Sequence, residues 1–253
     1  MVMTDSQLRD HYERKYAGER AAAAIRGIER TDSPVNREQA ALKYLAGRLH
    51  GSVLELGAGD GAVAAALLAA CPAITGYTLG DISAPRIEGV ARRLRDPRVR
   101  TLLVDAEAVD PEGESYDALV MIALVEHLID PLRALQRLRA VLRPGGFLYL
   151  DTPNIAKYTR RLQLLRGRFP STASGNEGLT TYEGQPVDLH DEGHLHYFSF
   201  RSLSLLLTQR CGFSRVEVCP YACGRLLLGR TLETRLARQW PGAFSELAVM
   251  AYA

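Results

Sequence analysis

The chain has 253 residues, with 31 Lys and Arg against 29 Asp and Glu, which leaves a net charge of +2. A nearly equal number of basic and acidic residues argues against a protein that binds nucleic acid in general through its phosphate backbone. Hydrophobic residues at 47% and charged residues at 24% are typical of a globular protein, which excludes a fibre and a disordered chain. The length fits either one core with added elements or a core with a small partner domain.

The first twenty residues are polar and charged, without the apolar stretch of a secretory signal. The most apolar run, Gly61 to Cys71, is closed by Pro72 and is well short of the roughly 20 residues that span a bilayer. Four cysteines without paired CxxC spacing are typical of a reducing compartment. We therefore expect a cytoplasmic protein with no membrane span.

The first fifty residues have a helical composition, and we interpret residues 1–50 as a helical cap. Short apolar strands then alternate with helices, which predicts a parallel sheet with helices on both faces. The predicted strands are Ser52–Leu56, Ile74–Leu79, Val99–Val104, Ala118–Ala123, Phe147–Leu150, Arg215–Val218 and Leu247–Tyr252. The predicted helices are Ala62–Ala70, Ala84–Leu94, Pro131–Val141 and Arg201–Cys211.

The alternation breaks after Asp151 for about fifty residues, which we interpret as an insertion over residues 153–199. Its first part, Asn154 to Phe169, carries basic side chains and no acid. A lid that favours an anionic acceptor and a solvated helix face both fit this pattern. The basic residues are Lys157, Arg160, Arg161, Arg166 and Arg168.

A glycine turn, Gly57 to Gly61, joins the first strand to the next helix and permits a ligand to approach the backbone closely. Its glycines also fit the dinucleotide fingerprint, so they alone do not choose between NAD and another adenosine ligand. Glu55 at the strand end and Asp60 at the helix start would repel a pyrophosphate. The two carboxylates therefore favour a ligand with a cationic amine and a sulfonium.

The segment Val53–Gly61 resembles the first motif of the class I S-adenosylmethionine-dependent methyltransferases. Four further motifs follow in the order of that family, so the resemblance is specific. It implies a Rossmann-like, seven-stranded, mostly parallel α/β sheet in a single methyltransferase domain, with the cofactor core at residues 51–152 and closing elements at 200–253. The further motifs are Gly80-Asp81-Ile82-Ser83, Val104-Asp105-Ala106-Glu107, Tyr116-Asp117-Ala118-Leu119-Val120 and Arg143-Pro144-Gly145-Gly146.

The resemblance implies S-adenosyl-L-methionine as cofactor and S-adenosyl-L-homocysteine as product. Asp81, beside Ile82, is expected to accept hydrogen bonds from the ribose hydroxyls, although a helix N-cap is the alternative. Asp105 and Ala106 are expected to meet the adenine edge, with capping as the alternative role of the carboxylate. The loop residues expected to bind the cofactor are Glu55, Gly57, Ala58, Gly59, Asp60 and Gly61.

Two further parts of the chain are expected to contact the cofactor. Ile122 and Ala123 end the fourth strand, where carbonyls of the family face the methionine amine. Tyr12 and Tyr16 resemble the aromatic amino-terminal helix that folds over the cofactor in many of these enzymes. Packing of the same two rings into the core fits equally well, because they are spaced i and i+4. The Arg143–Gly146 motif is expected to be structural, closing a helix and turning into a strand.

Histidines are the candidate bases, because methylation of a hydroxyl is helped by a group that titrates near neutrality. His127 follows the fourth strand, and His194 lies in the Gly193–Phe198 segment, which resembles ubiquinone-pathway and uncharacterised bacterial small-molecule methyltransferases. The segment could face the acceptor, bind a metal or pack over the sheet edge. The residues expected to contact the acceptor are His127, His190, His194, His196 and Tyr197.

Some relatives hold a divalent ion with Glu-x-x-Glu-His after the fourth strand. In this chain Ala123 stands in place of the first glutamate, and Glu126 and His127 remain. The change removes one hard oxygen ligand, so we expect no metal.

The sequence thus predicts a methyltransferase that acts on a hydroxyl of a small, sugar-containing or otherwise anionic metabolite. We expect no nucleic-acid partner, and a homodimer is left open. A tRNA or rRNA methyltransferase is the rival within the class, supported by the basic stretch alone. From other classes the rivals are a non-catalytic protein that binds an adenosyl ligand and an NAD-dependent oxidoreductase.

Overall fold

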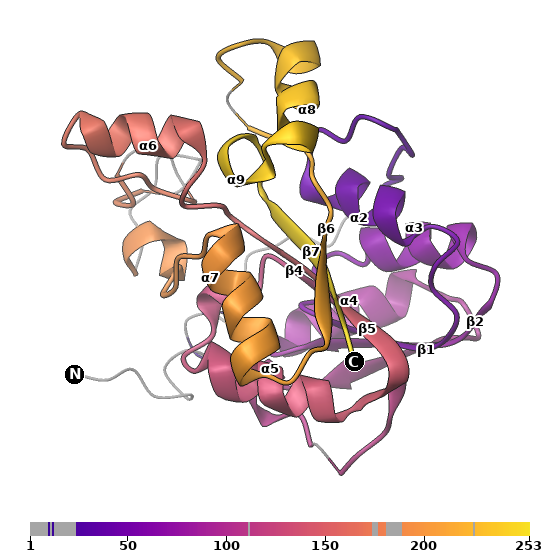
Figure 1. Ribbon diagram of the computed structural model, residues 1–253. Helices are drawn as coiled ribbons and strands as arrows, with labels where there is room; N and C mark the ends of the chain where they lie inside the picture. Colours follow the sequence, from indigo (N-terminus) through magenta and orange to yellow (C-terminus); the bar gives the residue numbers. More distant parts are fainter. Residues whose placement is uncertain are drawn as a thin grey trace.

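Figure 1 shows a computed structural model, which describes residues 10, 12, 24–110, 112–173, 177–180, 189–224 and 226–253. A seven-stranded sheet lies at its centre, in the order β3-β2-β1-β4-β5-β7-β6. The predicted α/β fold with a seven-stranded sheet is therefore confirmed. The strands are β1 (Gly51–Leu56), β2 (Ile74–Asp81), β3 (Val99–Leu103), β4 (Tyr116–Ile122), β5 (Leu142–Thr152), β6 (Arg215–Val218) and β7 (Leu247–Tyr252).

The first five strands run parallel, and β7 runs antiparallel to both β5 and β6. Along the chain, β2 and then β3 are added on one side of β1, and the chain then crosses over to β4, which lies on the other side of β1. Leu56 of β1 pairs with Met121 of β4, so the two strands end at the same edge. Ligands of open α/β sheets bind at such a reversal, outside the carboxyl ends of the strands.

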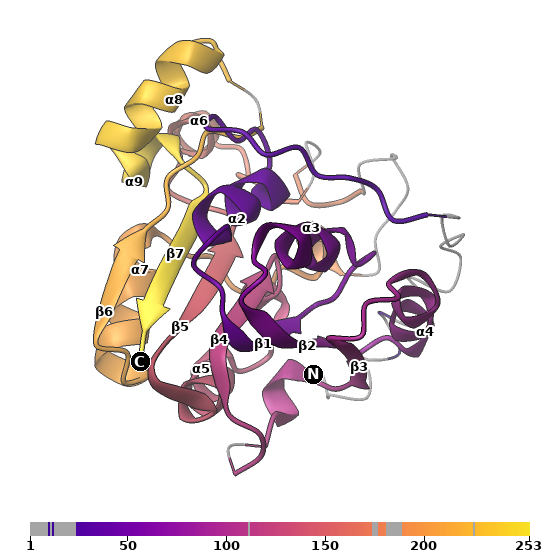
Figure 2. The ribbon, with the colours of Figure 1, turned by 90° about the vertical axis from the view of Figure 1, so that its right-hand side faces the viewer.

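Helices cover both faces of the sheet, as Figures 1 and 2 show. Buried side chains of α2, α3 and α4 form one core with one face, and those of α5 and α7 form a second core with the other. The helices are α2 (Arg37–Leu45), α3 (Ala62–Ala70), α4 (Ala84–Arg93), α5 (Pro131–Ala140), α6 (Tyr158–Leu165), α7 (Phe200–Leu205), α8 (Arg230–Gln239) and α9 (Pro241–Phe244). The short turns are the 3-10 helices η1 (Ala106–Ala108), η2 (Val125–His127) and η3 (His190–Gly193) and the π-helical turn η4 (Leu206–Arg210).

The motif Arg143–Gly146 was predicted to turn before the fifth strand, but it lies inside β5, which begins at Leu142. The pairing with β4 shifts register between Tyr116 and Ala118, so the strand absorbs the irregularity. Gly145 has φ +80°, and a Cβ on Gly146 would lie 2.8 Å from the Asp117 carbonyl. The prediction of a turn was therefore wrong, because glycines let the strand bulge and continue.

The insertion begins with α6, which has no buried residue of its own. At its start, Lys157 is 2% exposed and pairs with Glu246 at 3.2 Å, and Arg160 pairs with the same carboxylate at 2.8 Å. Two of the five basic residues of the predicted lid are thus internal ion-pair partners. In the part of the chain that is described, no helix is long and apolar enough to cross a membrane.

Candidate active site

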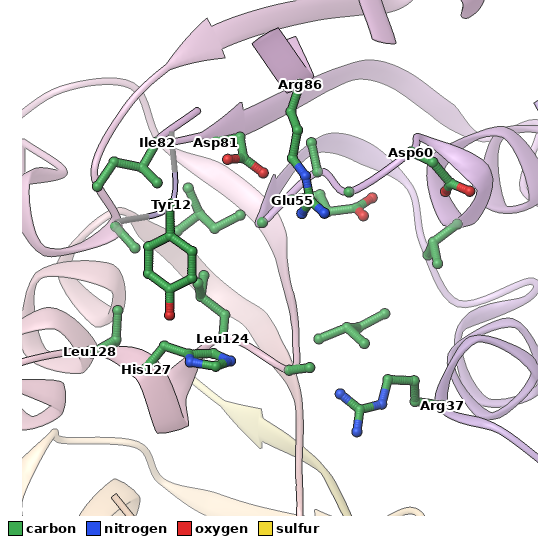
Figure 3. Close-up of a pocket in the computed structure, with 18 of the residues that line it drawn as sticks. Tyr12, Arg37, Glu55, Asp60, Asp81, Ile82, Arg86, Leu124, His127 and Leu128 are labelled. Carbon is green, nitrogen blue, oxygen red and sulfur yellow. The ribbon is translucent and has the colours of Figure 1, made fainter. Parts of the chain in front are cut away.

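A cavity of about 530 Å³ lies at the carboxyl ends of β1, β2 and β4, at the reversal of strand order (Figure 3). Its size is that of a small-molecule site. The walls come from segments far apart in the sequence, including α2, the loop after β1, the end of β2 and the insertion. The predicted cofactor residues that line it are Glu55, Gly57, Ala58, Gly59, Asp60, Asp81, Ile82, Asp105, Ala106, Ile122, Ala123 and Tyr12.

The glycine loop adopts left-handed backbone conformations, with φ of +79° at Gly57, +53° at Gly59 and +82° at Gly61. The amides of Gly57 and Ala58 donate to the Gly80 carbonyl at 2.9 and 3.2 Å, which ties the loop to the end of β2. Gly57 and Gly59 line the cavity, whereas Gly61 caps α3 and packs against Val90. The structure therefore gives Gly61 a positioning role in place of the predicted ligand contact.

Glu55 lies at the end of β1, 3% exposed, and accepts a hydrogen bond from the Tyr77 hydroxyl. Burial raises the pKa of Glu55 to about 8, against the lowering effect of that hydrogen bond. The carboxyl is therefore mostly protonated at neutral pH in the ligand-free protein. Burial thus weakens the repulsion that Glu55 would exert on a pyrophosphate, and its predicted contact with the cofactor stays a prediction.

Asp60 is held from two sides at the start of α3. Its side chain accepts from the Ala62 amide at 3.0 Å and pairs with Arg26 at 2.8 Å. Burial alone would raise the pKa of Asp60, but these hydrogen bonds outweigh burial and lower the pKa. The carboxylate is thus charged, but Arg26 offsets its charge, which weakens the expected attraction for a sulfonium.

Asp81 and Asp105 stand at the next two strand ends. Asp81 is 6% exposed and accepts from the Ser83 amide at 2.9 Å, while Ser83 itself is the N-cap of α4. Burial raises the pKa of Asp81. Asp105 caps η1 by accepting from the Glu107 amide at 2.9 Å, so the alternative capping role is filled while the residue still lines the cavity.

The end of β4 turns sharply at Ala123, a non-glycine residue with φ +50° whose amide donates to the Asp151 carbonyl at 2.9 Å. Such left-handed conformations cost energy and concentrate at functional sites. The turn carries Leu124 and His127 into the cavity wall. The ring of Tyr12 meets that of His127 edge-on, with centroids 5.7 Å apart. Tyr16 lies outside the described residues.

His127 and His194 meet at the cavity, with ring centroids 4.6 Å apart. The Nδ1 atom of His127 lies 3.0 Å from the Gly193 carbonyl oxygen. A carbonyl only accepts, so Nδ1 carries the proton and the Nε2 atom of neutral His127 carries the basic lone pair.

A chain of polar groups runs from His194 into the protein. The Thr172 hydroxyl donates to Asp191 at 2.7 Å and accepts from the Nδ1 atom of His194 at 2.6 Å. Asp191 is fully buried and also accepts from the Ser171 hydroxyl. Burial alone would raise the pKa of Asp191, but these hydrogen bonds outweigh burial and lower the pKa. The arrangement directs the basic lone pair of His194 to Nε2 and places a carboxylate behind it.

The other predicted acceptor contacts lie away from the cavity lining. The Nε2 atom of His190 is 2.9 Å from the Glu177 carbonyl, and that of His196 is 3.3 Å from the Ile129 carbonyl. The Tyr197 hydroxyl donates to Asp191 at 3.2 Å. These contacts pin the segment around residues 189–199, so the prediction that the residues touch the acceptor has no support here. His194 and His196 are both partly buried, whereas Leu195 and Tyr197 between and after them are exposed.

Glu126, His127 and His194 bring three ligand atoms within 4.8 Å of one another. One oxygen of Glu126, Oε2, accepts from the Thr152 hydroxyl at 2.8 Å, while Oε1 is buried and has no hydrogen-bond partner among the described residues. Two imidazoles and a carboxylate suit a divalent transition metal. The residues thus fit a metal ion, and the expectation of none stays a prediction.

Sequence reasoning missed several residues of the wall, above all Arg37 of α2. In Figure 3 its guanidinium points toward the centre of the cavity, across from Asp81. Its Nε atom lies 3.7 Å from Asp151, which is buried at the end of β5. Burial acts to lower the pKa of Arg37, but the Asp151 charge holds it above its usual range. An arginine in a helical stretch carries no local signal, because only the packing of α2 on the sheet brings it here.

The sheet has the strand order of the class I S-adenosylmethionine-dependent methyltransferases. The glycine loop after β1 and the acid after β2 both face one cavity, which defines a member of that class. A family model described as a methyltransferase domain matches residues 29–218, and the chain belongs to that family.

Relatives agree with this assignment. An uncharacterised methyltransferase of Mycobacterium tuberculosis is 34% identical over 100 residues, 40% of this chain and 49% of the relative. A ubiquinone biosynthesis O-methyltransferase of Bordetella avium is 28% identical over 116 residues, 45% of this chain and 47% of the relative. The chain thus spans about half the length of the curated relatives it matches.

Solved structures share the fold at low identity. A Haloferax volcanii methyltransferase in complex with the Trm112 activator has a TM-score of 0.59 at 16% identity, with 86% of this chain and 90% of that chain covered. The N-methyltransferase NodS of Bradyrhizobium japonicum, in complex with S-adenosyl-L-homocysteine, has a TM-score of 0.53 at 16% identity, with 87% and 88% covered. At this identity the likeness concerns the fold alone.

Proposed function

We propose that the chain methylates a hydroxyl of a small anionic metabolite, with His194 as the base. The observation that carries the proposal is the line from His194 through Thr172 to the buried Asp191 at the cavity wall. A carboxylate behind an imidazole stabilises the imidazolium that forms when the ring takes a proton. The Nδ1 atom of His127 faces the Gly193 carbonyl oxygen at 3.0 Å.

Different residues along the cavity would bind different parts of the cofactor. Asp81 would hold the ribose hydroxyls, the Asp105–Ala106 end would meet the adenine, and the loop from Gly57 to Gly59 would lie against the methionine part. Arg37, across the cavity from Asp81, would bind the methionine carboxylate. S-adenosyl-L-methionine, when bound, supplies a methyl group on a sulfonium that an acceptor oxygen can attack.

The protein residues then position the acceptor and remove its proton. His127 and Tyr12 form an aromatic corner against which a flat acceptor can pack. The hydroxyl proton passes to the Nε2 atom of His194 as the oxygen attacks, and Thr172 keeps the ring in the required tautomer. The described residues of the 153–199 insertion would serve as the lid, and Thr172, Ala173, Glu192 and His194 are those that line the cavity.

The test is turnover with hydroxyl-bearing sugar phosphates, nucleotide sugars and phenolic carboxylates, with methyl ethers detected by mass spectrometry. We expect His194→Gln to lower kcat about 100-fold or more, with the affinity for S-adenosylhomocysteine unchanged. The exposed His50→Gln is the matched control. A full rate in His194→Gln, or methylation on nitrogen or carbon alone, would overturn the proposal.

The Glu126, His127 and His194 donor set supports a second candidate, methyl transfer assisted by a divalent metal. These three residues would hold the ion, which would supply Lewis-acid chemistry for removing the proton of an acceptor hydroxyl. Dialysis against a chelator separates the two. Retained activity supports the metal-free base, and loss of activity restored by added Mn²⁺ or Zn²⁺ supports the metal.

A further inference from the structure

The helices α6, α8 and α9 gather at one end of the molecule, and Figures 1 and 2 agree on this. Tyr158, at the start of α6, joins them. Its hydroxyl bonds to Glu233 of α8 and accepts from the Leu227 amide at 3.0 Å, and its ring lies 5.0 Å from that of Phe244 in α9. We call the outer surface of these helices the α6–α8 face.

Large apolar side chains are exposed on this face. Leu164 and Leu165, which end α6, are 56% and 82% exposed. Trp240, which follows α8, is 59% exposed. Single exposed leucines are ordinary on a protein surface, whereas several on neighbouring helices are typical of an interaction site. The large apolar side chains exposed on these helices and the residues beside them are Leu164, Leu165, Leu227, Leu228, Leu232 and Trp240.

The exposed charges of the same helices are arginines. The one acid of α8, Glu233, is fully buried and held by Tyr158. Arg168 is offset by an ion pair with Glu177 at 2.9 Å, and the described residues offer no such pair to Arg166, Arg230 or Arg235. The exposed set is Arg161, Arg166, Arg168, Arg230, Arg235 and Arg238.

We propose that the α6–α8 face docks on an anionic phospholipid bilayer. Arginines attract acidic headgroups, while leucines and a tryptophan enter the boundary between headgroups and acyl chains. RNA would satisfy the arginines but would leave the six apolar side chains in water, so the pairing of the two features favours the bilayer. The segment after α6 leads to Thr172 and Ala173, which connects this face to the cavity wall.

Trp240 is the one tryptophan of the chain, so its fluorescence reports on this face without any substitution. We expect a blue shift when vesicles of phosphatidylcholine with phosphatidylglycerol are added to the full chain, and none with phosphatidylcholine alone. Flotation with the same vesicles should recover the protein, and raised salt should reduce the recovery because it screens the arginines.

Two double variants separate the contribution of the leucines to vesicle binding from that of the arginines. Leu164→Gln with Leu165→Gln should lower the bound fraction about tenfold, and Arg166→Gln with Arg235→Gln should do the same at low salt. Leu205→Gln, an exposed leucine that ends α7, should bind as the unaltered chain does. No blue shift and no flotation with anionic vesicles would overturn the proposal. So would binding that depends on the arginines alone and is equalled by a single-stranded RNA at the same salt.

Discussion

The proposed binding of the cofactor ribose can be tested at one side chain, Asp81. Its carboxylate is buried at the end of β2 and is already oriented by the Ser83 amide. A charged acceptor of two hydroxyl hydrogen bonds contributes on the order of 1.5 to 3 kcal/mol, so Asp81→Asn should weaken S-adenosylhomocysteine binding about tenfold or more. Calorimetric titration measures this, with the exposed Asp110→Asn as control. Equal affinity in Asp81→Asn would remove it from the ribose site.

Arg37 can be tested by the part of the ligand it is proposed to bind. Arg37→Gln should weaken S-adenosylhomocysteine about tenfold, because a charge-assisted hydrogen bond to a carboxylate is lost. Methylthioadenosine, which lacks the amino-acid part, should bind the variant and the unaltered chain equally. Arg48→Gln, an exposed arginine after the same helix, is the control. Equal losses for both ligands would show that Arg37 supports the fold and not the carboxylate.

Burial of Glu55 should make stability depend on pH. Its pKa of about 8 in the folded protein lies above the ordinary glutamate value, so the stabilisation is complete at low pH and is lost as pH rises through 8. Between pH 6 and 8.5 the free energy of unfolding should fall by about 2 to 3 kcal/mol more in the unaltered chain than in Glu55→Gln. Urea unfolding at both pH values measures the difference. Parallel slopes for the two proteins would contradict it.

At the scale of elements, the carboxylate of Glu246, the residue before β7, joins the start of that strand to the start of α6. It pairs with Lys157 and Arg160 and accepts from the Asn154 amide at 2.8 Å. Glu246→Gln should lower the free energy of unfolding by about 3 kcal/mol, because it leaves the buried lysine without a counter-charge. The exposed Glu88→Gln, whose pair with Arg92 is at the surface, should change it by less than about 0.5 kcal/mol. Chemical denaturation that finds the two variants alike would contradict this role.

The regular elements of the core could be predicted from sequence because their pattern is local. The helix at Ala62–Ala70 and the strands at Arg215–Val218 and Leu247–Tyr252 have the predicted bounds. The helix expected over Arg201–Cys211 instead divides into α7 and the π-helical η4. The burial of Lys157 could not be foreseen, because its partner Glu246 lies 89 residues further along the chain.

At the scale of the whole molecule, the cofactor residues were predictable as motifs and the acceptor side only in part, because His127 and His194 line the cavity whereas His190, His196 and Tyr197 do not. The loop after β1 and Asp81 carry family patterns, and the structure brings them to one cavity. The line from His194 to Thr172 and Asp191 depends on how the insertion folds back, and Thr172 gave no signal of its own. Long-range packing therefore decides which histidines face the cavity and which groups lie behind them.

A methyltransferase must bind S-adenosylmethionine in this cavity before it can transfer the methyl group. Isothermal titration of the full chain with S-adenosylhomocysteine and, separately, with NAD measures that binding. We expect one molecule of S-adenosylhomocysteine per chain at micromolar affinity, and no measurable heat from NAD. Tight binding of NAD without binding of S-adenosylhomocysteine would contradict it.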